Sequence, residues 1–373
     1  MKKLHTNNIN LILMRHFKVI FFLLVLWSPT LVFSQITYYN ADQFPVIGKI
    51  SNDTETRYER LPRELKNTCR PPVWHLGKNT SGLAVRFKTN STTIAARWET
   101  LNDAYMNHMS PTGTKGLDLY TWDQGKWVFM KTGRPTAKVS TQVIIDHMKP
   151  IEREYMLYLP LYDGIVSLEI GIDSTKTITQ PTLPFPRTQA PIVVYGTSIT
   201  QGGCAARPGM SFTNILERRL NTEVINLGFS GNGRLDMDVA EVIAKKTNAQ
   251  MFILDFAPNN GPENVKNKTI PFVNIIRKEN PNTPIVLIEN PIFPHGTYDQ
   301  EISKVVHDKN IELKKCFQAL KAKGDNNLYY ISSDNLIGND GEATVDGIHF
   351  TDLGFMRMAD VLLQEMKKMG IVQ

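Results

Sequence analysis

The stretch at residues 192–200, IVVYGTSIT, decides the fold of this chain. It consists of a short apolar run, residues 192–195, followed by Gly196 and then by Ser198, and a Gly-Gly pair follows at 202 and 203. A buried strand that passes through such a serine into a helix exposes the serine hydroxyl at the carboxyl edge of an α/β sheet. We therefore expect Ser198 to be a nucleophile, for which the rest of the chain must supply a base, an acid and oxyanion donors.

Beyond residue 191, apolar strand-like runs alternate with stretches of helical period. The runs lie at 192–195, 223–227, 251–256, 285–288 and 328–331, and a final amphipathic helix is expected from about 351 to 369. Strands that alternate with helices predict crossover connections and a mainly parallel sheet covered on both faces. In such sheets, ligands bind outside the carboxyl ends of the strands.

Residues 35 to about 173 show a two-residue period instead. Apolar residues alternate with polar ones, as at Leu83, Val85 and Phe87, and turn residues separate the runs. This pattern predicts an antiparallel, jelly-roll-like β-sandwich without helices. The Thr- and Pro-rich segment 175–191 is typical of a semi-rigid linker, so we expect a β-sandwich domain at 35–185 and an α/β domain at 186–373.

The N-terminal 34 residues are typical of an export signal. They contain four of the chain's basic residues and no acidic ones, and removing these four charges from the net +6 leaves +2, too little to indicate a nucleic-acid partner. The apolar run from Val19 to Trp27 is shorter than the roughly 20 residues that span a bilayer. We expect a signal peptide at 1–34, a periplasmic or extracellular protein, and no stable membrane span after cleavage; a single membrane anchor is the alternative.

Three strand ends carry residues that suit acyl chemistry. Ser198 follows the first strand, Gly228-Phe229-Ser230-Gly231-Asn232-Gly233 follows the second, and Asn259 and Asn260 follow the third. Glycine amides and an asparagine side chain can donate hydrogen bonds to the oxyanion that forms when a serine attacks a carbonyl. The glycines alone are also explained by a strand that must turn out of its sheet.

Asp346 and His349 follow the fifth strand. An acid three residues before a histidine can hold the imidazole through one tight turn, which leaves the other ring nitrogen to accept the Ser198 proton. A lone histidine is more often a packing or capping residue. Here the serine, the amide groups and the Asp-His pair each follow a strand of one predicted sheet, which favours a catalytic role.

In these four blocks the chain resembles the SGNH (GDSL-type) hydrolase superfamily over about residues 190–373. The resemblance implies a flavodoxin-like three-layer fold, with Ser198 as nucleophile, His349 as general base and Asp346 as its supporting acid. It also implies an oxyanion hole made of the Ser198 and Gly231 amides and the Asn259 side chain, with Gly228 and Asn260 as competing assignments. The chain departs from the family pattern at Thr197, where an aspartate is usual, and at Asn260, which replaces the aspartate of the third block.

Residues 116–120, Gly-Leu-Asp-Leu-Tyr, resemble the Gly-x-Asp-Leu-Tyr signature of a small β domain that precedes an acetylxylan-esterase-like subset of these hydrolases. That resemblance implies a carbohydrate ester as substrate. On physical grounds alone, Leu117 and Leu119 would face the core and Asp118 would cap a turn.

Several further residues have weaker claims to a role. His295 follows the fourth strand and can line the substrate pocket, and Arg234 can contact an acidic substrate or simply face solvent. Four tryptophans could form a sugar platform, although most tryptophans of a sandwich belong to its core; they are Trp74, Trp98, Trp122 and Trp127. The cysteines follow no metal-ligand spacing, and their odd count leaves at least one unpaired; they are Cys69, Cys204 and Cys316.

The leading hypothesis is an exported serine esterase that removes short acyl groups, most simply acetyl, from a carbohydrate or another small ester, with no metal or organic cofactor. An SGNH lipase or thioesterase acting on another acyl ester is the alternative within the enzyme class. Two non-enzymatic alternatives are open. The Ser198 loop could bind a phosphate or flavin phosphate, or the β-sandwich could bind a glycan beside an inactive hydrolase domain.

Overall fold

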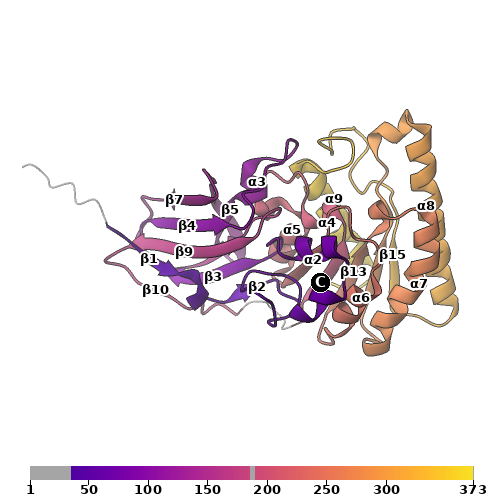
Figure 1. The fold of residues 1–373 in the computed structure, drawn as a ribbon, viewed down its shortest axis with the longest axis horizontal. Coiled ribbons are helices and arrows are strands. Elements are labelled where there is room, and N and C mark those ends of the chain that lie inside the picture. Colours follow the sequence, from indigo (N-terminus) through magenta and orange to yellow (C-terminus); the bar gives the residue numbers. More distant parts are fainter. Residues whose placement is uncertain (1–34, 185–189, 373) are drawn as a thin grey trace, which may run out of the picture. The chain divides into compact units, whose positions relative to one another are not determined.

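The computed structural model describes residues 35–184 and 190–372, and Figure 1 shows their fold. The signal peptide predicted at 1–34 and the domain boundary predicted between 185 and 186 lie outside the described residues and remain predictions. Within the described ranges, none of the helices combines the length and the apolarity needed to cross a membrane.

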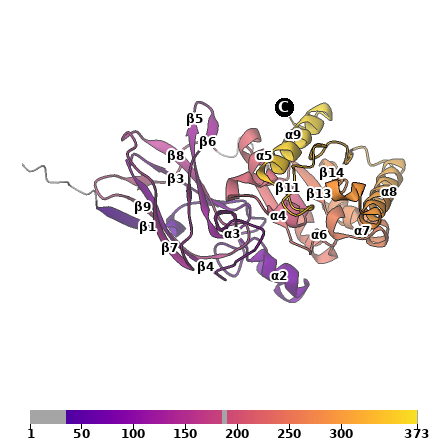
Figure 2. The ribbon, with the colours of Figure 1, turned by 90° about the horizontal axis from the view of Figure 1, so that it is seen from above.

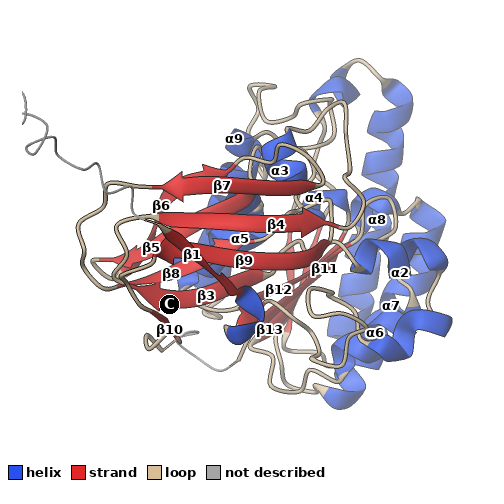
Figure 3. Cartoon of the chain, turned by 60° about the vertical axis from the view of Figure 1, so that its left-hand side comes forward, coloured by secondary structure: helices blue, strands red, loops and turns tan. Residues whose placement is uncertain are grey.

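The N-terminal half forms two antiparallel sheets, as its two-residue period predicts, and we call residues 36–179 the β-sandwich. The first sheet has the order β1-β9-β4-β7, and Figure 3 shows these four strands side by side. The second has the order β10-β3-β8-β5-β6, with β2 paired to β3. The strands of the first sheet are β1 (Ile36–Asn40), β9 (Ile165–Asp173), β4 (Ile94–Thr100) and β7 (Val139–Ile145). Those of the second are β10 (Ile178–Thr179), β3 (Ala84–Thr89), β8 (Arg153–Tyr158), β5 (Leu117–Asp123), β6 (Lys126–Gly133) and β2 (Val46–Ile47).

The two sheets enclose one apolar core. Phe87 of β3 and Tyr155 of β8 stack with ring centroids 5.2 Å apart, and Trp98 of β4 is fully buried beside them. Alternate residues of the two inner faces supply this core, which is why the apolar residues recur at every second position.

Two expectations for this half are wrong. Its loops contain the short helices α2 (Pro71–Gly77) and α3 (Pro111–Lys115), and the 3-10 turns η1 (Ala41–Gln43) and η2 (Arg63–Asn67). Both α-helices begin with proline, whose fixed φ suits a first helical position, and both are too short to show a helical period. The segment after residue 175 is not only a linker, because β10 extends the second sheet and Thr182 donates to Glu154.

The C-terminal half, residues 190–372, which we call the α/β part, contains a parallel sheet in the flavodoxin-like order β12-β11-β13-β14-β15, as predicted. Its strands are β11 (Ile192–Gly196), β12 (Val224–Gly228), β13 (Met251–Asp255), β14 (Ile285–Ile288) and β15 (Leu328–Ile331). Its helices are α4 (Ser198–Gln201), α5 (Phe212–Leu220), α6 (Met237–Ala244), α7 (Pro262–Glu279), α8 (Gln300–Ala322) and α9 (Asp352–Lys368), with the 3-10 turns η3 (Pro208–Met210), η4 (Ala257–Asn259) and η5 (Pro294–Thr297).

Helices cover both faces of the parallel sheet. Figure 2 shows α5 and α9 on one side of the strands and α6 and α7 on the other. Residues of one strand alternate between the two cores: Val193 and Tyr195 of β11 join the α6–α7 side, whereas Ile192 and Val194 join the α5–α9 side. Burial on both faces explains why these strands are continuous apolar runs.

Candidate active site

Ser198 lies where β11 meets α4. Gly196 ends the strand, Thr197 caps the helix by accepting the Ile199 amide at 3.2 Å, and Ser198 is the first helical residue. A Cβ on Gly196 would stand 2.0 Å from the Thr200 hydroxyl, so only glycine fits this close turn. The amide of a first helical residue has no partner within its helix, which leaves the Ser198 N–H available to a bound group.

The structure brings His349 and Asp346 to this serine. Ser198 Oγ lies 2.9 Å from His349 Nε2, and His349 Nδ1 lies 2.7 Å from Asp346 Oδ2. Because a carboxylate only accepts hydrogen bonds, the proton belongs on Nδ1, and Nε2 is then the nitrogen that can accept the serine proton. Serine, imidazole and carboxylate thus form a continuous hydrogen-bonded relay across 151 residues of sequence.

The Asp346 carboxylate is held by its own turn. Its Oδ1 accepts the backbone amides of Ile348 and His349 at 3.0 and 2.8 Å, and Gly347, directly after Asp346, has a φ of +90°, which favours glycine. Partial burial would raise the pKa of Asp346, but the hydrogen bonds from the His349 ring and these amides outweigh it and lower the pKa to about 2. The residue is therefore ionised at neutral pH and can support a protonated His349.

The two glycines that compete for the oxyanion role differ in their partners. The Gly228 amide, at the end of β12, already donates to the Asn226 side chain at 2.9 Å. Gly231 is exposed, with a φ of +66°, and its carbonyl accepts a 2.8 Å hydrogen bond from Arg234. We retain Gly231 as the proposed donor, since the Gly228 amide is occupied.

The two asparagines also differ. Asn260 is buried, and its Nδ2 donates to the carbonyls of Gly233 and Phe256, so it fixes the backbone after β13. Asn259 is half-buried, and its Oδ1 accepts the Gly233 amide at 3.1 Å, which turns its NH2 group away from that contact. These partners favour Asn259 as the side chain that can donate to a substrate oxygen.

Arginines of the β-sandwich brace the second strand end, a role that we did not predict from the sequence. Arg60 is fully buried and donates to the carbonyls of Asn226 and Gly228 at 3.0 and 2.9 Å. Arg70 donates to the side chain and the carbonyl of Asn232. The Gly-rich loop is therefore held from both halves of the chain.

The Gly-x-Asp-Leu-Tyr stretch is a contact between the halves, which corrects the expectation that Asp118 caps a turn. Asp118 is fully buried, and its Oδ2 accepts from the Arg207 guanidinium at 2.7 Å and from the Gly209 amide at 2.8 Å. Arg207 also donates to the Tyr120 hydroxyl at 2.7 Å. Because both sides of β5 are covered, its polar residue is as buried as its leucines, and a two-residue period cannot distinguish these environments.

Three further residues lie beside Ser198, His349 and Asp346, and of these only Cys204, six residues after Ser198, has a possible role that the sequence indicates. The Tyr162 hydroxyl donates to the Ser198 carbonyl at 3.2 Å. The His108 ring lies 5.5 Å from the His349 ring, and both Tyr162 and His108 come from loops of the β-sandwich. Cys204 is buried next to Asp346, and burial together with that carboxylate raises the pKa of its thiol to about 12. Tyr162 and His108 are distant from Ser198 in the sequence and belong to no motif, which explains why no pattern indicated them.

His295 and the four tryptophans, the remaining candidate residues, pack against other parts of the protein. His295 is half-buried and faces Gly347, since a Cβ on that glycine would stand 2.8 Å from its Nδ1. Trp74, Trp98 and Trp127 are buried and Trp122 is half-buried, so the four tryptophans do not form an exposed sugar platform.

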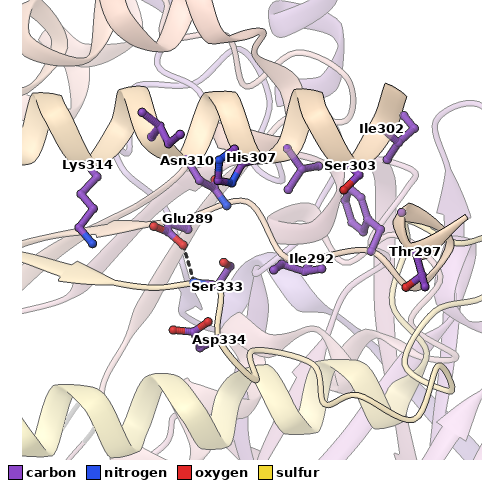
Figure 4. A pocket seen from close by; sticks show the side chains of 14 residues that line it. Glu289, Ile292, Thr297, Ile302, Ser303, His307, Asn310, Lys314, Ser333 and Asp334 are labelled. Atoms are coloured by element: carbon purple, nitrogen blue, oxygen red, sulfur yellow. Dashed lines mark hydrogen bonds between the residues drawn. The ribbon is translucent and has the colours of Figure 1, made fainter. Parts of the chain in front are cut away.

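A pocket of about 460 Å³ lies at the carboxyl ends of β14 and β15 (Figure 4). Ser198 follows β11 at the same edge of the parallel sheet. Polar side chains line it from α8 and from the strand ends, and Figure 4 marks the 2.7 Å hydrogen bond from the Ser333 amide to Glu289. Ser198, Asp346 and His349 do not line this pocket. Gly296 and Thr297 of η5 do, and η5 also places His295 against the Asp346 turn.

Comparisons with known proteins agree with this two-part architecture. The model of the GDSL-like lipase/acylhydrolase family matches residues 189–367, and a model described as the N-terminus of SGNH-hydrolase-type esterases matches residues 36–178. A comparison with curated proteins gives no significant match.

Solved structures include close and distant relatives. A protein from Bacteroides ovatus described as a GDSL-like lipase is 38% identical, covers 91% of this chain and 99% of its own, and superposes with a TM-score of 0.87. A salicylyl-acyltransferase from a tetracycline biosynthetic pathway is 21% identical, with coverages of 91% and 99% and a TM-score of 0.74. An acetyl xylan esterase from the rumen bacterium Butyrivibrio proteoclasticus is 13% identical, with coverages of 91% and 100% and a TM-score of 0.57, and shares the fold.

Proposed function

Since the chain belongs to the GDSL-like lipase/acylhydrolase family of SGNH hydrolases, and is thus a carboxylic ester hydrolase with a serine nucleophile, we propose that it removes short acyl groups, above all acetyl, from carbohydrate esters. Ser198, His349 and Asp346 carry the reaction. The observation that supports this assignment is the relay of 2.9 and 2.7 Å contacts from the Ser198 hydroxyl through the His349 ring to the Asp346 carboxylate.

In the proposed mechanism, Ser198 Oγ attacks the ester carbonyl while His349 Nε2 takes its proton. The amides of Ser198 and Gly231 and the side chain of Asn259 stabilise the oxyanion. His349 then protonates the leaving alcohol, and the acyl-enzyme remains. A water molecule that gives its proton to His349 attacks this acyl group, and the collapse of the second tetrahedral intermediate releases the acid and restores Ser198.

We favour a sugar as the alcohol part of the ester substrate. The β-sandwich carries the Gly-x-Asp-Leu-Tyr stretch, and proteins that share the two-part fold include the acetyl xylan esterase and a family two carbohydrate esterase from Clostridium thermocellum. The pocket of Figure 4, which both polar and apolar side chains line, lies at the same sheet edge as Ser198 and offers carboxylate, amide and hydroxyl groups that can bind sugar hydroxyls.

A serine-directed fluorophosphonate probe tests the nucleophile. We expect the folded protein to be labelled and the Ser198→Ala variant not to be, while Ser230→Ala, a serine of the neighbouring Gly-rich loop, keeps the label. Equal labelling of wild type and Ser198→Ala, or no labelling of the folded wild type, would refute the assignment.

A series of aryl esters and acetylated oligosaccharides tests the substrate. The kcat/KM for aryl acetate should exceed that for aryl octanoate, and acetate should be released from acetylated xylan fragments. A clear preference for acyl chains of eight or more carbons would exclude a sugar deacetylase while leaving the esterase mechanism intact.

We also propose that the enzyme acts in the periplasm or outside the cell, because residues 1–34 have the features of an export signal. Expression of the full chain with its N-terminus intact tests this. The exported fraction should contain a protein whose sequence starts near Gln35, and recovery of the uncleaved chain from the cytoplasm alone would contradict the proposal.

A further inference from the structure

Four potential metal ligands meet at the mouth of the active site. His108, Cys204, Asp346 and His349 each offer one ligand atom, and these atoms all lie within 4.8 Å of one another. They come from three separate loops: His108 from the β-sandwich, Cys204 from the turn after α4, and the other two from the loop before α9. The spacing of these residues in the sequence therefore does not reveal the cluster.

The proposed hydrolysis uses only two of the four residues. Asp346 and His349 belong to the relay, whereas Cys204 and His108 take part in no step. Cys204 is nevertheless fixed in place with a φ of +71°, a left-handed conformation that is costly for a residue with a side chain. The preceding residue, Gly203, fits tightly against the triad, because a Cβ there would stand 3.0 Å from His349 Cδ2.

We propose that this cluster binds a divalent transition-metal ion such as Zn²⁺ and that the bound ion reversibly switches off the esterase. Two imidazoles, a thiolate and a carboxylate are the donor set of a four-coordinate zinc site. The hard ions Mg²⁺ and Ca²⁺ prefer oxygen ligands and would bind poorly. On binding, the Cys204 thiol releases its proton to solvent, and the two negative ligands balance the charge of the ion.

The geometry requires only small adjustments. Ligand atoms around a tetrahedral zinc ion lie roughly 3 to 4 Å apart, given zinc–ligand bonds of about 2.0–2.3 Å. Because no two of the four atoms are more than 4.8 Å apart, the most widely separated of them must approach by about 1 Å. The His349 and Asp346 side chains are 21% and 34% exposed, and His108 is half-buried, so an ion can enter from solvent.

Inhibition follows from the role of His349. If the ion takes Nε2, Ser198 loses its base; if it takes Nδ1, the hydrogen bond to Asp346 is lost. In either case the relay is broken while the ion is bound. This part of the inference rests on the proposed function, whereas binding of the ion does not.

Inhibition by Zn²⁺ is the first test. Hydrolysis of an aryl acetate should fall with micromolar Zn²⁺, recover with a chelator, and be insensitive to Mg²⁺ at the same concentrations. Cys204→Ser and His108→Ala should each raise the half-inhibitory Zn²⁺ concentration at least about tenfold, since losing even a residue that merely supports a ligand weakens metal binding about 10–100-fold. The metal-free activity of each variant serves as its own reference.

Matched variants separate this cluster from other thiols and imidazoles. Cys316→Ser removes another buried cysteine, and His147→Ala removes a histidine whose side chain is 92% exposed. Both should keep the wild-type half-inhibitory concentration. Zn²⁺ inhibition that is unchanged in Cys204→Ser and His108→Ala would overturn the proposal.

Binding can be measured without activity in the Ser198→Ala protein. Co²⁺, which takes the same site geometry, should produce a cobalt–thiolate charge-transfer band in the near ultraviolet that Cys204→Ser abolishes and excess Zn²⁺ displaces. Absence of this band, or its persistence in Cys204→Ser, would overturn the site; a Cys204-dependent band with no Zn²⁺ inhibition of the active enzyme would overturn the switch. Because this arm uses inactive protein, its result does not depend on the proposed reaction.

Discussion

At the scale of single residues, Asp346 is the acid that reaches His349, although the family commonly has an aspartate at position 197 as well. Thr197 instead caps α4 through its hydroxyl and is fully buried. The two side chains therefore have separable roles, one in the relay and one in the backbone turn.

Asp346→Asn should lower kcat by about 10³–10⁴ with little change in KM. The Asn oxygen can keep the two backbone amides, but its NH2 group then donates to His349 Nδ1 and moves the ring proton to Nε2, toward Ser198. Steady-state kinetics on an aryl acetate measures this loss.

Thr197→Ala is the matched comparison. It should keep most of the activity and lower the free energy of unfolding by about 1 kcal/mol through loss of the cap, and Thr197→Ser should restore it. A loss of kcat in Thr197→Ala as large as in Asp346→Asn would contradict the separation of roles.

Asn259 and Asn260 provide a second pair. Asn259→Ala should lower kcat about 10²–10³-fold, since it removes a proposed oxyanion donor, and should cost only about 1 kcal/mol of stability, since the Gly233 amide loses a single acceptor. Asn260→Ala should mainly lower the free energy of unfolding, by about 2 kcal/mol or more, because it leaves the Gly233 and Phe256 carbonyls without their buried donor. The reverse pattern in kinetics and denaturant unfolding would assign the oxyanion donor to Asn260.

At the scale of elements, α4 is tied to the strand beside it. The Thr200 hydroxyl donates to Asp255 Oδ2 at 2.7 Å, and Asp255 is fully buried at the end of β13. Burial raises the pKa of Asp255 to about 7, although the Thr200 hydrogen bond lowers it in part. A neutral carboxyl group therefore supports the helix that carries Ser198 at acid pH.

This predicts a pH-dependent stability. The pKa of Asp255 in the folded protein lies above the ordinary value of 3.8. The contribution of this carboxyl group to the free energy of unfolding is therefore fully present below about pH 4 and is lost as the pH rises through about 7. At about 1.4 kcal/mol per pKa unit, the contribution is at most about 4 kcal/mol. Urea unfolding of wild type and Asp255→Asn at several pH values measures it.

Between pH 5 and pH 8, wild type should lose stability as Asp255 ionises, whereas the asparagine of Asp255→Asn cannot ionise. The free energy of unfolding of Asp255→Asn should therefore rise relative to that of wild type over this range. Asp360→Asn, whose side chain is 62% exposed, serves as the control and should show a pH-independent difference over that window. A pH-independent difference for Asp255→Asn as well would mean that Asp255 ionises normally in the fold.

The elements that the sequence predicts well are those whose signal is local. The strands β14 and β15 have the predicted bounds, because both are short runs of apolar and aromatic residues flanked by polar turns. Ser198, Asp346 and His349 could be proposed because each follows a strand of a parallel sheet, and strand ends of such a sheet meet at one edge. Their roles remain proposals, supported by the distances between them.

The features that the sequence does not predict depend on contacts between distant segments. Arg60 looks like any surface arginine in the sequence, yet it is fully buried against β12. His108 and Cys204 have no motif and meet only because loops of both halves converge on the triad. The helices α2 and α3 are shorter than two helical turns and show no period that could be read.

At the scale of the whole molecule, the described residues from 36 onward form one compact unit rather than two independent halves. Leu61, Leu65 and Trp74 of the N-terminal half belong to the same apolar core as α6 and α7. We therefore expect thermal unfolding to occur in one transition, with the loss of activity coincident with the loss of β-sandwich structure.

Arg60 offers the sharpest test of that coupling. It donates four hydrogen bonds to buried or half-buried carbonyls, two in the β-sandwich and two at the end of β12. Arg60→Met keeps the apolar bulk but leaves these carbonyls without donors, so the free energy of unfolding should fall by about 3–5 kcal/mol. Since β12 leads into the Gly231 loop, kcat should fall too, measured at a temperature where the variant is folded.

Arg97→Met is the control, because Arg97 lies on the outer face of the β-sandwich with its side chain 45% exposed, where it pairs with Glu169 and covers the Tyr38 ring. Its stability should change by less than about 1 kcal/mol, and its kcat should not change. Arg60→Met could instead unfold in two separate transitions, with the α/β part keeping wild-type kcat after the β-sandwich has unfolded. The β-sandwich would then not be needed to hold the active site in its structure. A single transition at lower denaturant, with activity lost across it, means that the β-sandwich is part of the structure that holds the Gly231 loop in place.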